Sequence, residues 1–394
     1  MIDSNRWLLP DGIEEVLPPM AGRVESLRRN LLDLYQSWGY DLVIPPFVEF
    51  LESLLTGVGS DLDIKTFKVT DQLTGRLMGV RADMTPQVAR IDAHSLKHQG
   101  PTRLCYSGSV LHTRAANMLA SRSPIQMGAE LYGCNSMAAD VEIVSLMLET
   151  INCASVKGVC LDIGNVAIYR HLVAAASLDS AQEKVLFELL QRKDKAGLQV
   201  FLDNQVVDAA VAKQLSVLAD LHGDKSVLAR ALTELAGAPA EVIKEIQLLV
   251  ELAGAIEQSF PNIPLYFDLS ELRGYQYHTG IVFSAYAQGH GQAVAKGGRY
   301  DDIGQVFGRA RPATGFSTDL KALIEATTSS ETDRVAVVLA PEGYDAPLMS
   351  FIRSLRESGR VVVRALAADV TQEGQHAASQ QIVSKDGQWV VENI

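Results

Sequence analysis

Residues 272–283 read LRGYQYHTGIVF and combine groups suited to ligand binding with the pattern of a β-strand. The segment 275–283 is rich in β-branched and aromatic residues, which predicts a strand. Before it, Arg273 offers a planar fork of donors, and Gly274 lets a ligand approach the backbone closely. Polar groups at one end and apolar groups at the other are typical of a small-molecule pocket floor. Taken alone, however, the stretch favours an ordinary antiparallel strand with one solvent-exposed face.

The composition is that of an ordinary globular protein. The chain has 394 residues, of which 47% are hydrophobic and 21% charged, and its formal net charge is −12. This length allows two or three domains, and the acidic balance argues against a protein whose main task is to bind nucleic-acid backbones. No apolar run reaches the roughly 20 residues of a membrane span, and the first residues do not resemble a signal peptide.

The four cysteines, Cys105, Cys134, Cys153 and Cys160, form no CxxC pair, so the sequence indicates neither a zinc site nor a redox site. Buried free thiols in a reducing cytoplasm are expected, which predicts a cytoplasmic protein. His94 and His98 have metal-ligand spacing, but no Glu or Cys stands at a matching position. A solvated helix face is the better interpretation, and neither a metal nor a cofactor is predicted.

Hydrophobic periodicity predicts a mixture of helices and strands in the first 150 residues. It indicates a helix over 21–39, a strand over 40–44, a hairpin over 66–70 and 77–81, a helix from Pro86 capped by Thr85, strands over 103–110 and 124–132, and a helix over 136–151. In the strand 124–132, period-two alternation places Gln126 and Glu130 on one face. An amide and a carboxylate there could hold an ammonium group, although a salt-bridged sheet edge is the alternative.

The rest of the chain predicts an insertion and a small second domain. A strand over 159–163 precedes a helical, Ala- and Leu-rich insertion at about 166–260, to which no chemistry can be assigned. Further strands follow, and Asp319 is expected to cap a helix that starts at Leu320. After a polar linker, residues 334–394 give a strand, a helix and a strand, and then a polar, irregular stretch over 367–381. We therefore expect an α+β protein with a core domain over 1–328 and a truncated α/β unit over 334–394.

Five motifs, in the right order, resemble the catalytic core of a class II aminoacyl-tRNA synthetase of the histidyl-tRNA synthetase kind. They are the helix–strand signature from Gly39 to Glu49, RADMT at 81–85 for R-P-E-G-T, QMGAE at 126–130 for Q-x-G-x-E, RGYQY at 273–277 for R-G-L-D-Y-Y, and GGRYD at 297–301. The likeness covers about residues 8–325. It implies an antiparallel sheet flanked by helices, and dimerisation through the first motif.

The departures from this resemblance concern ATP chemistry. Where the family has two phosphate-binding arginines, this chain has Leu111 and Ala322. The glutamates that accompany those arginines in the family are replaced here by Thr113 and Lys321. Loss of one such contact typically costs about 10²–10³ in rate. Asp319 replaces a glycine and is expected to repel a phosphate. Arg114, which is close to Leu111 in the sequence, is the one candidate replacement for a lost arginine. In addition, Gln276 replaces the aspartate of the histidine motif, and a complete anticodon-binding domain is missing.

A synthetase-like fold without ATP chemistry is similar to one known group, the regulatory subunits of ATP phosphoribosyltransferase. The stretches VLHTR, GAELYG, YHTGIVF and GGRYD are close to that group. This resemblance implies a protein without catalytic activity that forms a homodimer within a hetero-oligomer with the short catalytic subunit. That subunit condenses ATP with phosphoribosyl pyrophosphate in the first step of histidine biosynthesis, and the regulatory subunit supports its activity and its feedback inhibition by histidine.

The two resemblances together imply a histidine-like amino-acid pocket made of Asp83, Thr85, Gln126, Glu130, Arg273 and Tyr277. In this hypothesis Asp83 and Glu130 hold the ammonium group, and Gln126 and Tyr277 orient the ligand. Arg273 binds its carboxylate or another anionic group. The alternative is a relic pocket, with histidine bound at a subunit interface. A diverged but active histidyl-tRNA synthetase, an ATP-dependent ligase for another substrate, and a binding module for some other partner also remain open.

Overall fold

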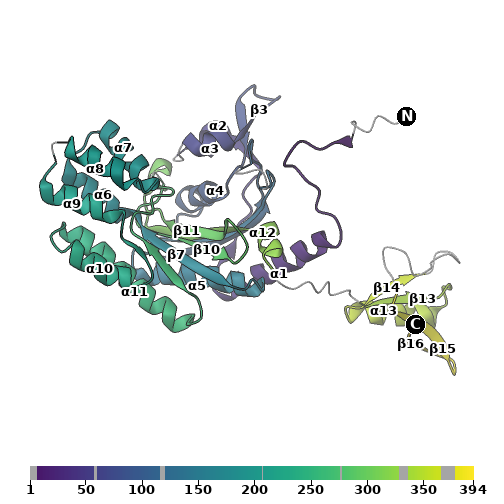
Figure 1. The fold of residues 1–394 in the computed structure, drawn as a ribbon. Coiled ribbons are helices and arrows are strands. Elements are labelled where there is room, and N and C mark those ends of the chain that lie inside the picture. The colour runs from purple at the N-terminus through teal and green to yellow at the C-terminus, as the bar shows by residue number, and fades with distance from the viewer. Residues whose placement is uncertain are drawn as a thin grey trace. The chain divides into compact units, whose positions relative to one another are not determined.

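The computed structural model describes residues 7–56, 60–115, 120–205, 207–275, 277–327, 336–364 and 378–394. The chain divides into two compact units, Met1–Thr328 and Ser329–Ile394 (Figure 1). Each unit has its own sheet and its own apolar core. The larger unit holds all of the predicted pocket residues.

A nine-stranded sheet organises the larger unit. Its order is β1 (Asp41–Leu42), β5 (Thr102–Ser109), β6 (Ile125–Tyr132), β12 (Ala313–Asp319), β11 (Ala293–Arg299), β10 (Ile281–Ala287), β7 (Val159–Asn165), β9 (Leu265–Asp268) and β8 (His222–Gly223). Only the β1–β5 and β7–β9 pairs are parallel. The prediction of an α+β fold with an antiparallel sheet flanked by helices is thus confirmed.

The two faces of this sheet have different coverings. On one face, α1 (Met20–Ser37), α5 (Met137–Cys153) and α11 (Ala240–Ser259) build the main core (Figure 1). Met127, Ala129 and Leu131 of β6 join that core, as alternation requires, so Glu130 must point to the opposite face. That opposite face carries the pocket.

Short elements lie beside the pocket face. A three-stranded sheet contains β2 (Val48–Phe50), β4 (Leu77–Val80) and β3 (Phe67–Thr70), and it is accompanied by α2 (Leu51–Leu54) and α3 (Ser60–Lys65). Helix α4 (Thr85–Arg90) continues into a π-helix, Ile91–Leu96. The predicted cap at Thr85 is wrong: the helix begins at Thr85 without a side-chain cap, because the Thr85 hydroxyl pairs with Tyr106 instead.

The helical insertion consists of α6 (Val166–Ala176), α7 (Ser180–Gln191), α8 (Lys195–Asp203), α9 (Ala209–Leu218), α10 (Ser226–Glu234) and α11. Its only described strand is β8, which pairs with β9 at the edge of the large sheet. After β12, helix α12 (Leu320–Glu325) begins as predicted at its cap, where the Asp319 side chain accepts a hydrogen bond from the Lys321 N–H.

The smaller unit is a four-stranded sheet with one helix. The strand order is β14 (Val361–Arg364), β13 (Val337–Ala340), β15 (Gln380–Lys385) and β16 (Gln388–Asn393), with α13 (Ala346–Glu357) packed on it. The expectation of an irregular stretch up to residue 381 is wrong at its end, because β15 starts at Gln380 and pairs with β16. The other residues of that stretch, up to 377, lie outside the described ranges.

The segment 275–283 departs most from its prediction. The strand starts only at Ile281, and Tyr275 and Tyr277 lie in turns, while Gln276 lies outside the described residues. Gly274 has a φ of +71°, and its carbonyl accepts hydrogen bonds from the N–H groups of Tyr277 and His278. A glycine in this left-handed region reverses the chain locally, so the β-propensity of the described residues just before Ile281 is overridden.

Two further expectations concern cysteines and membranes. The four thiols are free, but only Cys105 is buried and Cys153 is exposed, so the expectation that all are buried is wrong. Within the described ranges, no helix combines the length and the apolar character needed to cross a membrane.

Candidate functional site

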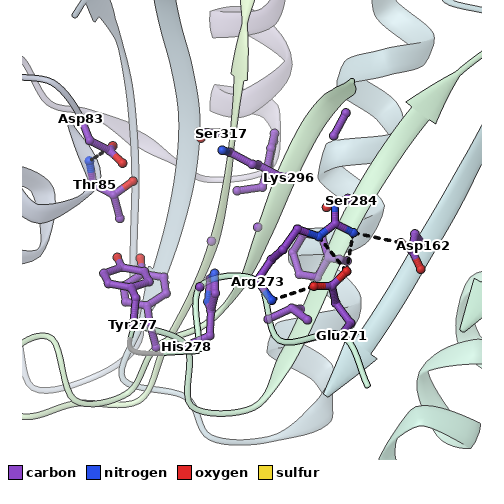
Figure 2. Close-up of a pocket in the computed structure, with 18 of the residues that line it drawn as sticks. Asp83, Thr85, Asp162, Glu271, Arg273, Tyr277, His278, Ser284, Lys296 and Ser317 are labelled. Carbon is purple, nitrogen blue, oxygen red and sulfur yellow. Dashed lines mark hydrogen bonds and ion pairs between the residues drawn. The ribbon is translucent and has the colours of Figure 1, made fainter. Parts of the chain in front are cut away.

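A cavity of about 500 Å³ lies on the pocket face of the large sheet (Figure 2). Five of the six predicted residues line it: Asp83, Thr85, Glu130, Arg273 and Tyr277. The sixth, Gln126, does not. Figure 2 shows Asp83 and Thr85 at one end of the cavity and Arg273 at the other.

The strand register explains why the cavity is open beside Glu130. Glu130 of β6 stands opposite Gly315 of β12. A Cβ atom on Gly315 would lie 1.5 Å from Oε2 of Glu130, which is impossible without rearrangement. Gly315 on β12 therefore makes room for the Glu130 carboxylate on β6.

Glu130 is a buried carboxylate held by phenol groups. It is 1% exposed, and it accepts hydrogen bonds from the hydroxyls of Tyr106 (3.0 Å) and Tyr300. Burial raises its pKa to about 8, although the hydrogen bonds oppose the shift. Because no described cation pairs with it, its charged form is poorly compensated and would be stabilised by a bound ammonium group.

Asp83 is the second carboxylate at this end of the cavity. Its Oδ1 accepts hydrogen bonds from Nε2 of Gln126 (2.8 Å) and from the N–H of Thr85 (3.0 Å). The Gln126 Oε1 in turn accepts from the Met84 N–H. Both ends of the Gln126 amide are therefore engaged, and this residue positions Asp83 rather than lining the cavity itself.

Tyr277 contributes an aromatic wall with a free hydroxyl. Its ring stacks on that of Tyr300, with centroids 5.1 Å apart, and meets the His278 ring edge-on. The Tyr277 hydroxyl is buried and has no partner among the described residues. An unpartnered buried hydroxyl is costly, so this group is available to a polar ligand.

Arg273 lines the cavity, but its guanidinium is already engaged. Its Nε donates to Oε2 of Glu271 (2.7 Å), its Nη2 lies 3.3 Å from Oδ2 of Asp162, and its Nη1 donates to the Tyr286 hydroxyl. Burial and the neighbouring Glu271 raise the pKa of Asp162 to about 6. The predicted carboxylate-binding group is thus surrounded by the chain's own acidic side chains.

The positions that replace the synthetase ATP contacts do not face the cavity. Lys321 donates to Glu14 (2.7 Å) and to Ser121 (2.9 Å), which ties α12 to the N-terminal segment. Asp319 accepts N–H groups from Ile125 and Lys321, so it stabilises backbone and does not line the cavity as a phosphate-repelling group. Leu111, Ala322 and the exposed Arg114 are also outside the lining.

Sequence reasoning missed several residues that line or build the cavity. They are Tyr106, Asp162, Glu271, His278, Ser284, Lys296, Tyr300 and Ser317. Tyr300 lies inside a motif that was recognised, and Lys296 directly precedes it. Period-two alternation puts Lys296 on the same face of its strand as Gly298, which is the cavity face. No sequence pattern, however, indicates which residues of other strands lie beside Lys296.

Two family models match this chain. The model described as histidyl-tRNA synthetase matches residues 12–323. The model described as ATP phosphoribosyltransferase subunit HisZ C-terminal domain matches residues 335–392. Together they cover both units of the structure.

Curated relatives match over the whole chain. A protein of Thioalkalivibrio sulfidiphilus (strain HL-EbGR7) is 53% identical, with 100% of both chains covered. A protein of Azotobacter vinelandii (strain DJ / ATCC BAA-1303) is 52% identical, with 99% of both chains covered. Both are named ATP phosphoribosyltransferase regulatory subunit.

Solved structures show the same fold. A chain described as an ATP phosphoribosyltransferase regulatory subunit/histidyl-tRNA synthetase, from Bacillus halodurans C, superposes with a TM-score of 0.81 at 25% identity, covering 94% of this chain and 96% of that one. Histidyl-tRNA synthetase from Nostoc sp. PCC 7120 gives a TM-score of 0.75 at 16% identity, with 98% and 94% covered. The class II synthetase-like fold is thereby confirmed. Because relatives of that name share more than half of its residues over its full length, the chain belongs to the family of ATP phosphoribosyltransferase regulatory subunits.

Proposed function

We propose that this chain is the non-catalytic regulatory subunit of an ATP phosphoribosyltransferase. It assembles with the short catalytic subunit in the cytoplasm, supports its activity in the first step of histidine biosynthesis, and makes that activity sensitive to histidine. One observation carries the proposal: the chain is 53% identical to a regulatory subunit over its whole length.

The site supports a role without chemistry of its own. In the synthetase resemblance, two arginines grip ATP, and their positions are Leu111 and Ala322 here. Neither residue lines the cavity, and Lys321 beside Ala322 is bound to Glu14 and Ser121. Since an apolar side chain cannot neutralise a phosphate, ATP activation has no charged support at these positions.

The pocket supports histidine as the regulatory ligand. Asp83 and Glu130 offer two carboxylates for its ammonium group. The ring of Tyr277 offers a flat surface with a hydroxyl that no described residue binds. Thr85 connects the two carboxylates, because its N–H binds Asp83 and its hydroxyl binds Tyr106, which in turn donates to Glu130. Binding in this pocket regulates activity only if the ligand prefers one of two states of the complex.

A homodimer through the first-motif region is a further part of the proposal. Three large apolar side chains of this region, Leu42, Ile44 and Phe47, are exposed, Ile44 by 82%. A cluster of exposed apolar side chains in a short segment is typical of an interaction surface. A second copy of the chain is the partner that the family resemblance implies.

A reconstitution assay tests the function. The short catalytic subunit is assayed with ATP and phosphoribosyl pyrophosphate, alone and with the purified chain, over a histidine titration. We expect a rate increase on mixing and inhibition by histidine that the catalytic subunit alone does not show. If the rate and the histidine sensitivity were both unchanged while the chain is folded, the proposal would be wrong.

A second assay separates this function from that of an active synthetase. Histidine-dependent exchange between ATP and pyrophosphate is measured with the chain alone. We expect no exchange above background, because Leu111 and Ala322 supply no phosphate contact. Exchange at the rate of a synthetase would support the rival function instead.

A further inference from the structure

Among the described residues that line the cavity, one cation is not already paired with an acidic group. Of the lining residues, Arg273 and Lys296 are the cationic ones, since burial lowers the pKa of His278 to about 4 and leaves it neutral. Arg273 is paired with Glu271 and Asp162. Lys296 is exposed to the cavity and makes no hydrogen bond or ion pair with the described residues.

Lys296 is flanked by two hydroxyl groups on the same row of the sheet. Its partner on β12 is Ser317, and its partner on β10 is Ser284. All three side chains line the cavity, and neither serine hydroxyl has a described hydrogen-bond partner. Directly opposed residues on neighbouring strands have Cβ atoms about 5 Å apart, so Lys296 has one hydroxyl donor on each side, and the two serines are about 10 Å from each other.

Lys296, Ser317 and Ser284 lie between two acidic parts of the cavity. Beyond Ser284 lies Asp162 on β7, and beyond Ser317 lies β6 with Glu130 one row further on. Figure 2 shows Lys296 between the Asp83–Thr85 end and the Arg273 end. From strand spacing and rise, the Cα atoms of Lys296 and Glu130 are about 12 Å apart, a span that two long side chains and one small zwitterion can fill.

We propose that Lys296, Ser317 and Ser284 form the anion subsite of the pocket and bind the carboxylate of the amino-acid ligand, in place of Arg273. This inference rests on the proposed histidine pocket and assigns the one ligand group that Asp83, Glu130 and Tyr277 leave unbound. The lysine supplies the charge, and a neighbouring serine hydroxyl can add a hydrogen bond to a carboxylate oxygen. Arg273 instead holds Glu271 and Asp162 together at the far wall.

The test compares two ligands on matched variants by calorimetry. Histidine and its amino alcohol, which lacks only the carboxylate, are titrated into the full chain and into its Lys296→Met, Lys296→Arg and Arg273→Met variants. We expect Lys296→Met to weaken histidine binding about 10-fold and to leave amino-alcohol binding within about 2-fold. Lys296→Arg should restore most of the histidine affinity, and Arg273→Met should change it by less than about 3-fold.

Two results would overturn the subsite. Either Lys296→Met binds histidine as the natural chain does, or Arg273→Met alone selectively loses the carboxylate-bearing ligand. A further arm titrates inorganic phosphate: a loss of phosphate binding in Lys296→Met with unchanged histidine binding would show that the cluster is a phosphate site. The Glu130→Gln variant distinguishes failure of the anion subsite from failure of the proposed histidine pocket. Unchanged affinity for both ligands in that variant would refute the pocket itself.

Discussion

Glu130 carries a carboxylate that the sheet buries before any ligand is present. Its pKa is about 8 in the folded chain, against an ordinary value of 4.5. As the pH rises, Glu130 therefore ionises in the unfolded chain before it ionises in the folded chain. The free energy of unfolding consequently decreases between about pH 4.5 and pH 8. Below that window the group costs nothing, because it is protonated in both states.

Replacing Glu130 by Gln removes this pH-dependent cost while keeping the shape of the side chain. We expect the free energy of unfolding of the variant to exceed that of the natural chain by an amount that grows from pH 5 to pH 8. At pH 8 the difference should be on the order of a few kcal/mol. Urea unfolding of both proteins at the two pH values measures the difference, and groups unaffected by the substitution cancel in the comparison. An equal difference at both pH values would contradict the buried, cation-free state of Glu130.

At the scale of elements, the site depends on close approach between β6 and β12. A Cβ atom on Gly315 would collide with Glu130 and would also lie 2.8 Å from the Ala129 carbonyl oxygen. The two strands are paired in register on both sides of this position, Phe316 with Ala129 and Thr314 with Leu131. The collision can therefore be relieved only by moving the buried carboxylate or by separating the strands.

We expect Gly315→Ala to lower the free energy of unfolding by about 1–3 kcal/mol and to weaken histidine binding. Gly254→Ala is the matched control, because Gly254 lies inside α11 and an added Cβ would meet nothing within 4 Å. That control should raise stability by roughly 1 kcal/mol through helix propensity. Chemical denaturation measures both, and a Gly315→Ala protein as stable as the natural chain would refute the close packing.

For the molecule as a whole, the exposed apolar segment at 42–47 predicts the assembly state. Burial of an exposed Ile side chain in an interface contributes about 1.5–3 kcal/mol to the stability of a dimer. An unpaired carboxylate buried at the same place costs more than that. Ile44→Asp should therefore weaken a homodimer at least about 100-fold without unfolding the chain. Light scattering over a dilution series measures the mass, with Val200→Asp on α8, which replaces another exposed residue, as the control. If Ile44→Asp stays as dimeric as the natural chain, the dimer is formed elsewhere.

Local patterns predicted the elements that alternate or repeat cleanly, such as the strand with Glu130 and the helix capped by Asp319. They were wrong at Tyr275 and at 277–280, where the left-handed Gly274 and its carbonyl hold a turn. Aromatic residues there favour a strand by propensity, but Tyr277 packs against both Tyr300 and His278. Propensity describes a residue's preference, and tertiary contacts overrode it.

The sequence by itself determined the fold class, the order of the synthetase-like motifs, and the loss of the two phosphate-binding arginines at Leu111 and Ala322. These follow from residue identity and spacing along the chain. Only the tertiary structure decided which of the cations described around the cavity is unpaired. Arg273 meets Asp162, which is more than a hundred positions away, and Lys296 meets Ser317 and Ser284 on other strands. Such neighbours are set by sheet register, which depends on packing of the whole sheet and cannot be read from any one segment.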